Sequence, residues 1–353
     1  MEVAEIYMAR CLQLAQKGIG SARPNPSVGC VIVCDDRVIG EGFTSAYGGN
    51  HAEVNAILSV EDTSLLKKAT LYVTLEPCAH YGKTPPCANL IVEHKIPNVV
   101  IGCVDTNSVV SGKGIEHLIA NGCDVKVGVL EQECIEQHKR FFMVQNKNRP
   151  YIILKWAETL DGFIAPEKRD IDRPVWISNS YAQQLVHKWR SEEHAILVGT
   201  ETAIADNPKL DVRKWGGTSP IRFVLDRTGR IPISNPLLDN SIKTIVCVDN
   251  AIFESKTSKN NVIYEAIDFK KNLAKNVVNV LMKHSIQSII IEGGSQTLQT
   301  FINDGMWDEA RVFIGDVKFK KGVKAPVLSV TSKSSKMIKN TELRVFENLK
   351  NNN

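Results

Sequence analysis

Three side chains between residues 51 and 87 are of types that can hold a metal ion. His51 is the first residue of the segment HAEVNAI, and Cys78 and Cys87 are the first and last residues of the segment CAHYGKTPPC. One imidazole and two thiolates form a three-ligand set for zinc, which leaves the fourth tetrahedral position open to water. A bound zinc ion lowers the pKa of that water towards neutrality. Glu53, two residues after His51, could then carry a proton from the water to a leaving amine without binding the metal.

The order H-x-E, then P-C, then a second Cys is typical of zinc deaminases, in which the Glu is the acid and base. Here eight residues, AHYGKTPP, separate Cys78 from Cys87, where the usual spacing is two. A loop that carries the cation Lys83 beside a catalytic metal indicates binding of an anionic part of the substrate. Two other interpretations stay open, namely a closed structural zinc site with a fourth ligand such as His80, and a pair of ordinary buried thiols.

The elements around these residues predict a layered α/β domain. A helix is expected over 51–58, a strand over 69–75 that runs into Cys78, and a helix over 85–95 with Cys87 near its start. Alternating strands and helices indicate an α/β fold. Further expected elements are helices over 2–17, 115–120 and 131–145, strands over 28–34, 38–43, 98–103 and 125–129, and a hairpin turn at 35–37.

Length and composition limit the number of domains and the kinds of partner that the protein can have. A chain of 353 residues predicts two domains, here 1–146 and 150–345, because polar residues and Pro cluster at 146–150. No apolar stretch is long enough to cross a bilayer, and the N-terminus lacks a secretory pattern, so a cytoplasmic protein without membrane contact is expected. The net charge is only +4, and the one dense basic block is KFKKGVK, so no nucleic-acid partner is demanded.

The nine cysteines show no disulfide-like pattern, which fits a reducing compartment. Seven of them are expected to be structural: Cys11, Cys30, Cys34, Cys103, Cys123, Cys134 and Cys247.

The second half also alternates strands and helices. A strand over 288–291 runs into Gly293-Gly294-Ser295 and a helix over 296–303, an arrangement that offers free backbone N–H groups to a phosphate and equally describes a plain turn. It is not G-x-G-x-x-G, so no Rossmann fold is predicted. Other expected elements are strands over 151–157, 195–199, 221–225 and 244–248, a helix over 180–190 capped by Ser178 or Asn179, and a polar loop over 199–213.

Charged residues of this half suggest a second site. Arg190 and Arg213 suit a phosphate, because a planar guanidinium binds it with two parallel hydrogen bonds; surface salt bridges are the alternative. Lys155 could assist a reduction or pair with Glu292, and Asp206 could bond ribose hydroxyls or cap a turn.

The longer motifs resemble the bifunctional deaminase–reductase family of riboflavin biosynthesis. ARPNPSVGCVIV, HAEV and PCAHYGKTPPC match its first half, and KWAETLDGFIA, VWISN, VHKWR, ILVGTETAIADNPKLDVR and IIIEGGSQTL match its reductase half, over about residues 1–330. The resemblance implies an α/β protein with a cytidine-deaminase-like α/β/α domain followed by a dihydrofolate-reductase-like α/β domain, in a homodimer. It implies zinc-dependent hydrolytic deamination of 2,5-diamino-6-ribosylamino-4(3H)-pyrimidinone 5′-phosphate. NADPH-dependent reduction of the ribosyl group then gives 5-amino-6-ribitylamino-uracil 5′-phosphate.

The resemblance also implies roles for individual residues. His51, Cys78 and Cys87 would bind one zinc ion per chain, and Glu53 would move the proton. Implied NADPH contacts are Ala157, Trp176, Thr202, Asp206, Gly294 and Ser295. Implied substrate contacts are Asn25, His80 and Lys83 in the first half, and Pro174, Arg190, Leu210, Arg213 and Glu292 in the second.

Three positions depart from the family pattern. Thr44 stands where the family usually has His, and Pro174 replaces a residue with a polar side chain. Arg227 stands where a small hydroxyl residue is common, and its length and charge suit the 2′-phosphate of a cofactor. The tail after Val330 is polar and is expected to fray. Two competing functions are a nucleic-acid-editing deaminase with an accessory domain and a non-catalytic scaffold with structural zinc.

Overall fold

The structure is a computed structural model that describes residues 2–79, 81, 85–106, 111–168 and 175–349. The chain divides into two compact units, Met1–Asn148 and Arg149–Asn353, and each is described by itself. Their division falls close to the boundary expected from the polar segment at 146–150.

The first unit is built on a five-stranded sheet in the order β2-β1-β3-β4-β5. β1 runs antiparallel to β2 and β3, whereas β3, β4 and β5 are parallel. Asp35 and Asp36 have φ angles of 49° and 59°, the left-handed conformation that a two-residue turn between β1 and β2 requires. The strands are β1 (Gly29–Cys34), β2 (Arg37–Phe43), β3 (Thr70–Leu75), β4 (Asn98–Cys103) and β5 (Asp124–Val127).

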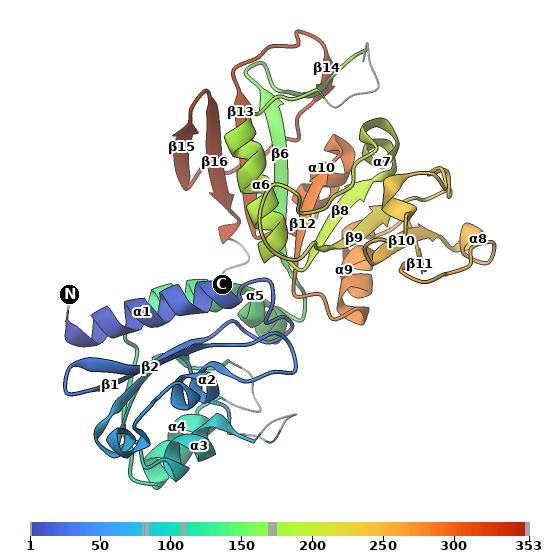
Figure 1. Ribbon diagram of the computed structural model, residues 1–353. Helices are drawn as coiled ribbons and strands as arrows, with labels where there is room; N and C mark the ends of the chain where they lie inside the picture. Colours follow the sequence, from blue (N-terminus) through green and yellow to red (C-terminus); the bar gives the residue numbers. More distant parts are fainter. Residues whose placement is uncertain (1, 80, 82–84, 107–110, 169–174, 350–353) are drawn as a thin grey trace. The chain divides into compact units, whose positions relative to one another are not determined.

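Helices cover both faces of this sheet, as Figure 1 shows. α1 and α5 contact each other and pack on one face, while α2 and α3 pack together with α4 on the other. This confirms the expected α/β/α arrangement. The helices are α1 (Val3–Gly18), α2 (Ala52–Leu58), α3 (Cys87–Glu93), α4 (Lys113–Ala120) and α5 (Glu131–Lys147), with the short 3-10 helix η1 (Thr63–Lys68).

The second unit is built on a nine-stranded sheet in the order β11-β10-β9-β8-β12-β6-β13-β16-β15. The first seven strands of that order are parallel, and β16 and β15 add an antiparallel edge. They are β6 (Tyr151–Thr159), β8 (Ala195–Gly199), β9 (Ile221–Leu225), β10 (Thr244–Asp249), β11 (Val262–Ile267), β12 (Ser288–Gly293), β13 (Glu309–Gly315), β15 (Ser334–Ile338) and β16 (Thr341–Glu347).

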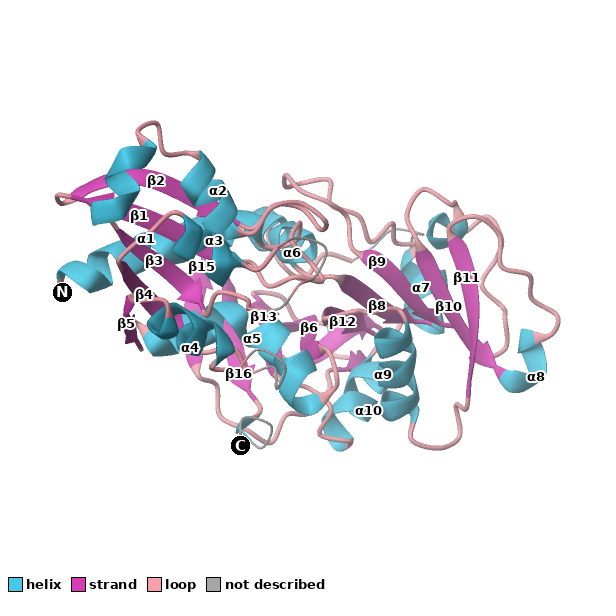
Figure 2. Cartoon of the chain, turned by 90° about the horizontal axis from the view of Figure 1, so that it is seen from below, coloured by secondary structure: helices cyan, strands magenta, loops and turns pink. Residues whose placement is uncertain are grey.

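Two helix layers cover this larger sheet. Buried residues of α9 (Leu273–Lys283) and α10 (Ser295–Asn303) join Ala310 and Val312 of β13 in one core cluster. Trp189 of α6 (Ser180–Glu192) instead stacks on Phe313, which points to the opposite face because side chains alternate along a strand. Figure 2 shows this separation of α6 from α9 and α10. Asn179 caps α6 by accepting from Ala182 N at 3.0 Å, as one of the two expected caps.

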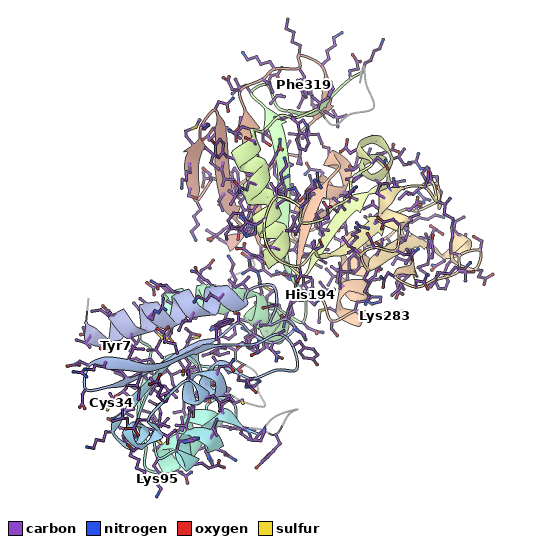
Figure 3. All side chains as sticks on the ribbon, viewed as in Figure 1. Tyr7, Cys34, Lys95, His194, Lys283 and Phe319 are labelled. Carbon is purple, nitrogen blue, oxygen red and sulfur yellow. The ribbon has the colours of Figure 1, made fainter. Side chains whose placement is uncertain are left out.

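A turn after β6 is held by one carboxylate. Asp161 accepts hydrogen bonds from Thr159 Oγ1 at 2.6 Å and from the N–H groups of Phe319 and Lys320 at 3.2 and 2.8 Å. Figure 3 labels Phe319 in this region. The turn leads into a separate two-stranded sheet of β7 (Phe163–Pro166) and β14 (Gly322–Lys324).

Two expectations for this unit are wrong. The polar segment 199–213 is not all loop, because Thr200–Asp206 forms helix α7 directly after β8. The tail after Val330 does not fray along its length, because β15 and β16 pair with each other and β16 pairs with β13. The backbone N–H and C=O groups of this tail form hydrogen bonds with neighbouring strands of the sheet. Such pairing partners are far away in the sequence, so the polar composition of the tail does not predict them. The remaining short elements are the helix α8 (Asn250–Phe253) and the 3-10 helix η2 (Pro236–Leu238).

Candidate functional site: a three-ligand metal centre and the carboxyl edge of the second sheet

The three expected metal ligands converge from separate elements. His51 is the residue before α2, Cys78 follows β3, and Cys87 is the first residue of α3. Nδ1 of His51 lies 3.6 Å from Sγ of Cys78 and 3.3 Å from Sγ of Cys87. All three donor atoms lie within 4.8 Å of one another.

This geometry fits a tetrahedral zinc ion. Zn–S bonds of about 2.3 Å and Zn–N bonds of about 2.0 Å place sulfur and nitrogen ligands about 3.5 Å apart at tetrahedral angles. The observed separations of 3.6 and 3.3 Å lie on either side of that value. Among the described residues this is the one group of three or more His, Cys, Asp or Glu side chains with such spacing.

The sulfur of Cys78 is in the form that binds a cation. Hydrogen bonds from Cys87 and His51 lower the pKa of Cys78 to about 4. The backbone N–H of Cys87 also donates to Sγ of Cys78 at 3.4 Å. In turn, the hydrogen bond to Cys78 raises the pKa of His51. Cys78 is therefore a thiolate near neutral pH, the form that binds metal. The hydrogen bond with Cys78, together with burial, raises the pKa of Cys87.

Glu53 lies in the first turn of α2 and is only 4 % exposed. Burial, followed by the nearby Cys78, raises the pKa of Glu53 to about 7, while the charge of His51 opposes this rise. A bound cation would lower that pKa again, because an opposite charge favours the ionised form. The carboxylate thus lies beside the ligand set with a protonation state that can change near neutral pH.

The loop before β1 holds Asn25, which is half-buried, and whose backbone N–H donates to Ala22 O at 3.0 Å. Thr44 does not extend from the surface as a substrate contact would. It is 3 % exposed, and its hydroxyl accepts from Val28 N at 2.9 Å. The expected contacts His80 and Lys83 lie outside the described residues, as does Pro174 of the second unit.

Sequence reasoning missed Glu76, which lies between β3 and Cys78. Its carboxylate accepts from the backbone N–H groups of Asp105, Gly112, Gly114 and Ile115 at 3.2, 3.1, 2.9 and 3.3 Å. An added Cβ at Gly114 would meet Pro77 O at 2.1 Å, so the start of α4 packs directly on the segment that carries Cys78. The available signal in the sequence was an acidic residue between an apolar strand and Pro77-Cys78.

Four of the six expected cofactor residues of the second unit lie at one sheet edge. β6, β8, β9 and β12 are parallel, so their carboxyl ends meet, and loops at such an edge are the usual ligand site of an α/β sheet. Ala157 lies near the end of β6, Thr202 in α7 after β8, and Gly294 and Ser295 after β12. A Cβ added at Gly294 would lie 3.2 Å from Thr202 Oγ1, so these two residues are neighbours.

Two further residues, Asp206 and Trp176, are expected cofactor contacts. Asp206 ends α7 and is half-buried. Trp176 is 58 % exposed, with Lys214 Nζ 5.7 Å from its ring centroid. Arg227 follows β9 and lies 3.8 Å from Asp249, with a side chain that is 54 % exposed.

A buried ion cluster joins three of the charged residues. Arg190 binds Glu292 with two hydrogen bonds, and Lys155 Nζ lies 3.7 Å from Glu292 Oε2. Lys155 thus pairs with Glu292, one of the two roles that the sequence left open. Burial alone would raise the pKa of Glu292, but the charges of Arg190 and Lys155 outweigh it and lower that pKa to about 2. Burial lowers the pKa of Lys155.

The segment after α7 approaches this cluster. Arg190 Nη1 donates to Asp211 O at 3.3 Å, and Arg213 N donates to His187 Nδ1 at 3.3 Å. The guanidinium of Arg213 is paired with the carboxylate of Asp211. Leu210 is buried, with φ of 50°.

Family comparisons divide the chain in two. Residues 1–103 match the zinc-binding region of cytidine and deoxycytidylate deaminases, and residues 150–319 match the RibD C-terminal domain. A riboflavin biosynthesis protein RibD of Aquifex aeolicus is 36 % identical over 332 residues, which cover 94 % of this chain and 92 % of the relative. The protein of that name in Escherichia coli is 34 % identical over 326 residues, or 88 % of this chain and 87 % of the relative.

Comparison with solved structures finds the same family. A diaminohydroxyphosphoribosylaminopyrimidine deaminase/5-amino-6-(5-phosphoribosylamino)uracil reductase of Thermotoga maritima superposes with a TM-score of 0.88 at 35 % identity, with 98 % of each chain covered. RibD of Acinetobacter baumannii gives 0.85 at 31 % identity, again with 98 % of each chain covered. In the part of the chain that the structure describes, no helix is both long enough and apolar enough to span a membrane.

Proposed function

Since the chain belongs to the RibD family of riboflavin biosynthesis proteins, we propose that its two units perform the consecutive deaminase and reductase steps with the residues described above. The protein is a bifunctional enzyme with both activities. The proposed substrate of the first unit is 2,5-diamino-6-ribosylamino-4(3H)-pyrimidinone 5′-phosphate. The second unit then reduces the ribosyl group of the deaminated product to ribityl.

His51, Cys78 and Cys87 are the proposed ligands of one zinc ion per chain. Their donor spacing supports this assignment, and so does the low pKa of Cys78. A bound zinc ion would supply a water of lowered pKa at its open position.

Glu53 is the proposed proton carrier of the deamination. Its carboxylate takes a proton from the attacking water and delivers it to the amine that leaves as ammonia. Burial of the side chain keeps bulk water away from this proton. The effects of Cys78 and His51 on the pKa of Glu53 support its placement at the ligand set.

The remaining contacts of the first unit rest on the family resemblance. Asn25 is proposed to bind the pyrimidine, and His80 and Lys83 to face the substrate and its phosphate. The sequence supports the roles of His80 and Lys83, because both lie between the ligands Cys78 and Cys87, whereas Asn25 lies in the separate motif ARPNPSVGCVIV.

The carboxyl edge of the larger sheet is the proposed NADPH site. Ala157, Trp176, Thr202, Asp206, Gly294 and Ser295 are the proposed contacts. Four of these, Ala157, Thr202, Gly294 and Ser295, follow or end parallel strands whose carboxyl ends meet. The N–H groups at the start of α10 are suited to a phosphate.

The ribosyl phosphate is proposed to bind beside the buried ion cluster. Arg190, Arg213 and Glu292 supply its charged and polar contacts, with Leu210 and Pro174 as the further residues that the resemblance implies. The imine carbon of the ring-opened ribosylamine would lie near Lys155, whose pKa is lowered by burial. The same resemblance supports a cytoplasmic homodimer that acts on a small molecule, without a nucleic-acid partner.

The observation that carries the deaminase assignment is the convergence of His51, Cys78 and Cys87 with Glu53 beside them. The test is a coupled assay on the purified full-length chain, with ammonia release and NADPH oxidation followed in parallel. We expect NADPH oxidation on the diamino substrate only after ammonia has been released, and without delay on the deaminated substrate. Bound zinc without any ammonia release would contradict the proposal.

A further inference from the structure

Helix α5 (Glu131–Lys147) belongs to the first unit but lies beyond residues 1–103, which match the deaminase zinc-binding region. Two consecutive residues of this helix, Gln137 and His138, nevertheless reach the segment that carries the proposed pyrimidine contact Asn25. The deaminase motifs say nothing about either residue, and no step described above uses them.

Gln137 contacts the loop itself. Its amide Nε2 donates to the carbonyl oxygen of Ser27, two residues after Asn25, at 3.2 Å. The hydroxyl of Ser27 in turn donates to Ala15 O of α1 at 2.5 Å. The end of the loop is thus held between two helices on the same face of the sheet.

His138 is linked through one intermediate residue to Gly29, the first residue of β1. Its Nε2 lies 3.0 Å from the hydroxyl of Thr74, and that same hydroxyl accepts from Gly29 N at 3.2 Å. His138 is 2 % exposed, and burial lowers its pKa to about 3. The imidazole therefore stays neutral at the pH values at which enzymes work, and this contact does not switch with pH.

A third side chain, that of Thr44, holds the residue between Ser27 and Gly29. Thr44 Oγ1 accepts from Val28 N at 2.9 Å. Side chains from three places outside β1 thus hold three consecutive residues, Ser27, Val28 and Gly29, directly after the Asn25 loop. A short loop fixed at this end has fewer conformations to lose when a substrate binds.

We infer that Gln137 is a positioning residue of the deaminase, which fixes the loop of Asn25 from helix α5, and that His138 supports it through Thr74. The inference depends on the proposed function in one respect, namely that the loop of Asn25 binds the pyrimidine substrate. It predicts that loss of the Gln137 donor weakens substrate binding more than it slows the chemical step, because Gln137 contacts neither the metal ligands nor Glu53.

The test compares two matched substitutions in the full-length protein. Gln137→Glu keeps the shape of the side chain but replaces the donor to Ser27 O with an acceptor. Gln132→Glu makes the same change at an exposed position of the same helix. We expect Gln137→Glu to raise the deaminase KM about fivefold to tenfold, which corresponds to one lost hydrogen bond. Its kcat and zinc content should stay within about twofold of those of Gln132→Glu.

A rescue variant and a substrate-free readout complete the experiment. Gln137→Lys restores a donor at this position and should bring KM back towards that of the unmodified protein. Hydrogen exchange in the peptide that spans residues 23–29 should be faster in Gln137→Glu than in Gln132→Glu. This exchange needs no substrate, so it tests the inference even if the unmodified protein releases no ammonia, the result that would overturn the proposed function.

Two results would overturn the inference. One is an unchanged KM and unchanged exchange in Gln137→Glu. The other is a joint loss of kcat, zinc and unfolding temperature, which would make Gln137 a purely structural residue. Reduction of the deaminated substrate by the second unit should be the same in all the variants.

Discussion

Arg190 and Glu292 form a buried two-point ion pair, with Nε 3.0 Å from Oε1 and Nη2 2.7 Å from Oε2. The side chains are 11 % and 8 % exposed, and Lys155 approaches the same carboxylate. Two charged groups removed from water are stable together only while both stay ionised and bonded. The pair therefore links the stability of the second unit to the charge at its proposed active site.

The first prediction concerns pH. The pKa of Glu292 is lowered from 4.5 to about 2, so the folded state binds fewer protons than the unfolded state between these values. The stabilisation is complete above about pH 4.5 and is lost as the pH falls towards 2. The unfolding temperature of the second unit should therefore fall steeply as the pH is lowered over this range. Glu292→Gln should make the unfolding temperature less dependent on pH. Glu201→Gln, at an exposed pair with Arg230, should leave that dependence unchanged.

The second prediction concerns the start of the second unit. Arg149 binds Asp308 with two hydrogen bonds of 2.7 and 2.6 Å, and Asp308 also accepts from Ile152 N at 2.8 Å. Arg149→Ala leaves a buried carboxylate without its cation, which should cost about 3–5 kcal/mol of unfolding free energy. Denaturant unfolding measures this loss.

The exposed pair of Arg344 with Glu342 provides the comparison, because Arg344→Ala should cost less than about 1 kcal/mol. Equal losses in the two variants would show that burial does not control the strength of these pairs.

Parts of this architecture could be predicted from the sequence, and the reason differs between residues. His51, Cys78 and Cys87 were found because metal chemistry restricts both the residue types and their order. Gln137 and Glu76 were missed because each bonds to backbone groups of segments far away in sequence, which any residue type can supply. The helix α7 was missed because seven residues carry little helical periodicity.

The third prediction concerns Thr44. Its hydroxyl is the partner of Val28 N, so Thr44→Val should leave a buried N–H without an acceptor. The expected cost is about 1–3 kcal/mol of unfolding free energy for the first unit, with a raised deaminase KM. Thr44→Ser keeps the hydroxyl and should retain the KM of the unmodified protein. A Thr44→Val variant with normal KM and stability would show that the hydroxyl has no positioning role.

The fourth prediction concerns the metal. Cys78→Ser removes a thiolate ligand, and the affinity for zinc should fall by more than about a hundredfold, since even changes outside the ligand set cost 10- to 100-fold. Competition with a chromophoric chelator measures this affinity without any substrate. Cys123→Ser is the matched control, because Cys123 is a half-buried thiol whose hydrogen bond to Ile96 O a serine can keep. Equal zinc affinity in the two variants would remove Cys78 from the ligand set.

Ammonia release by Glu53→Gln tests the central claim most directly. The substitution keeps the size of the side chain but removes its ability to carry a proton. We expect zinc content to stay at about one ion per chain while kcat for ammonia release falls by about 10²- to 10⁴-fold, and NADPH oxidation on the deaminated substrate should be unchanged. Ammonia release at the rate of the unmodified protein would contradict the account, because the buried carboxylate beside His51, Cys78 and Cys87 would then have no part in the reaction.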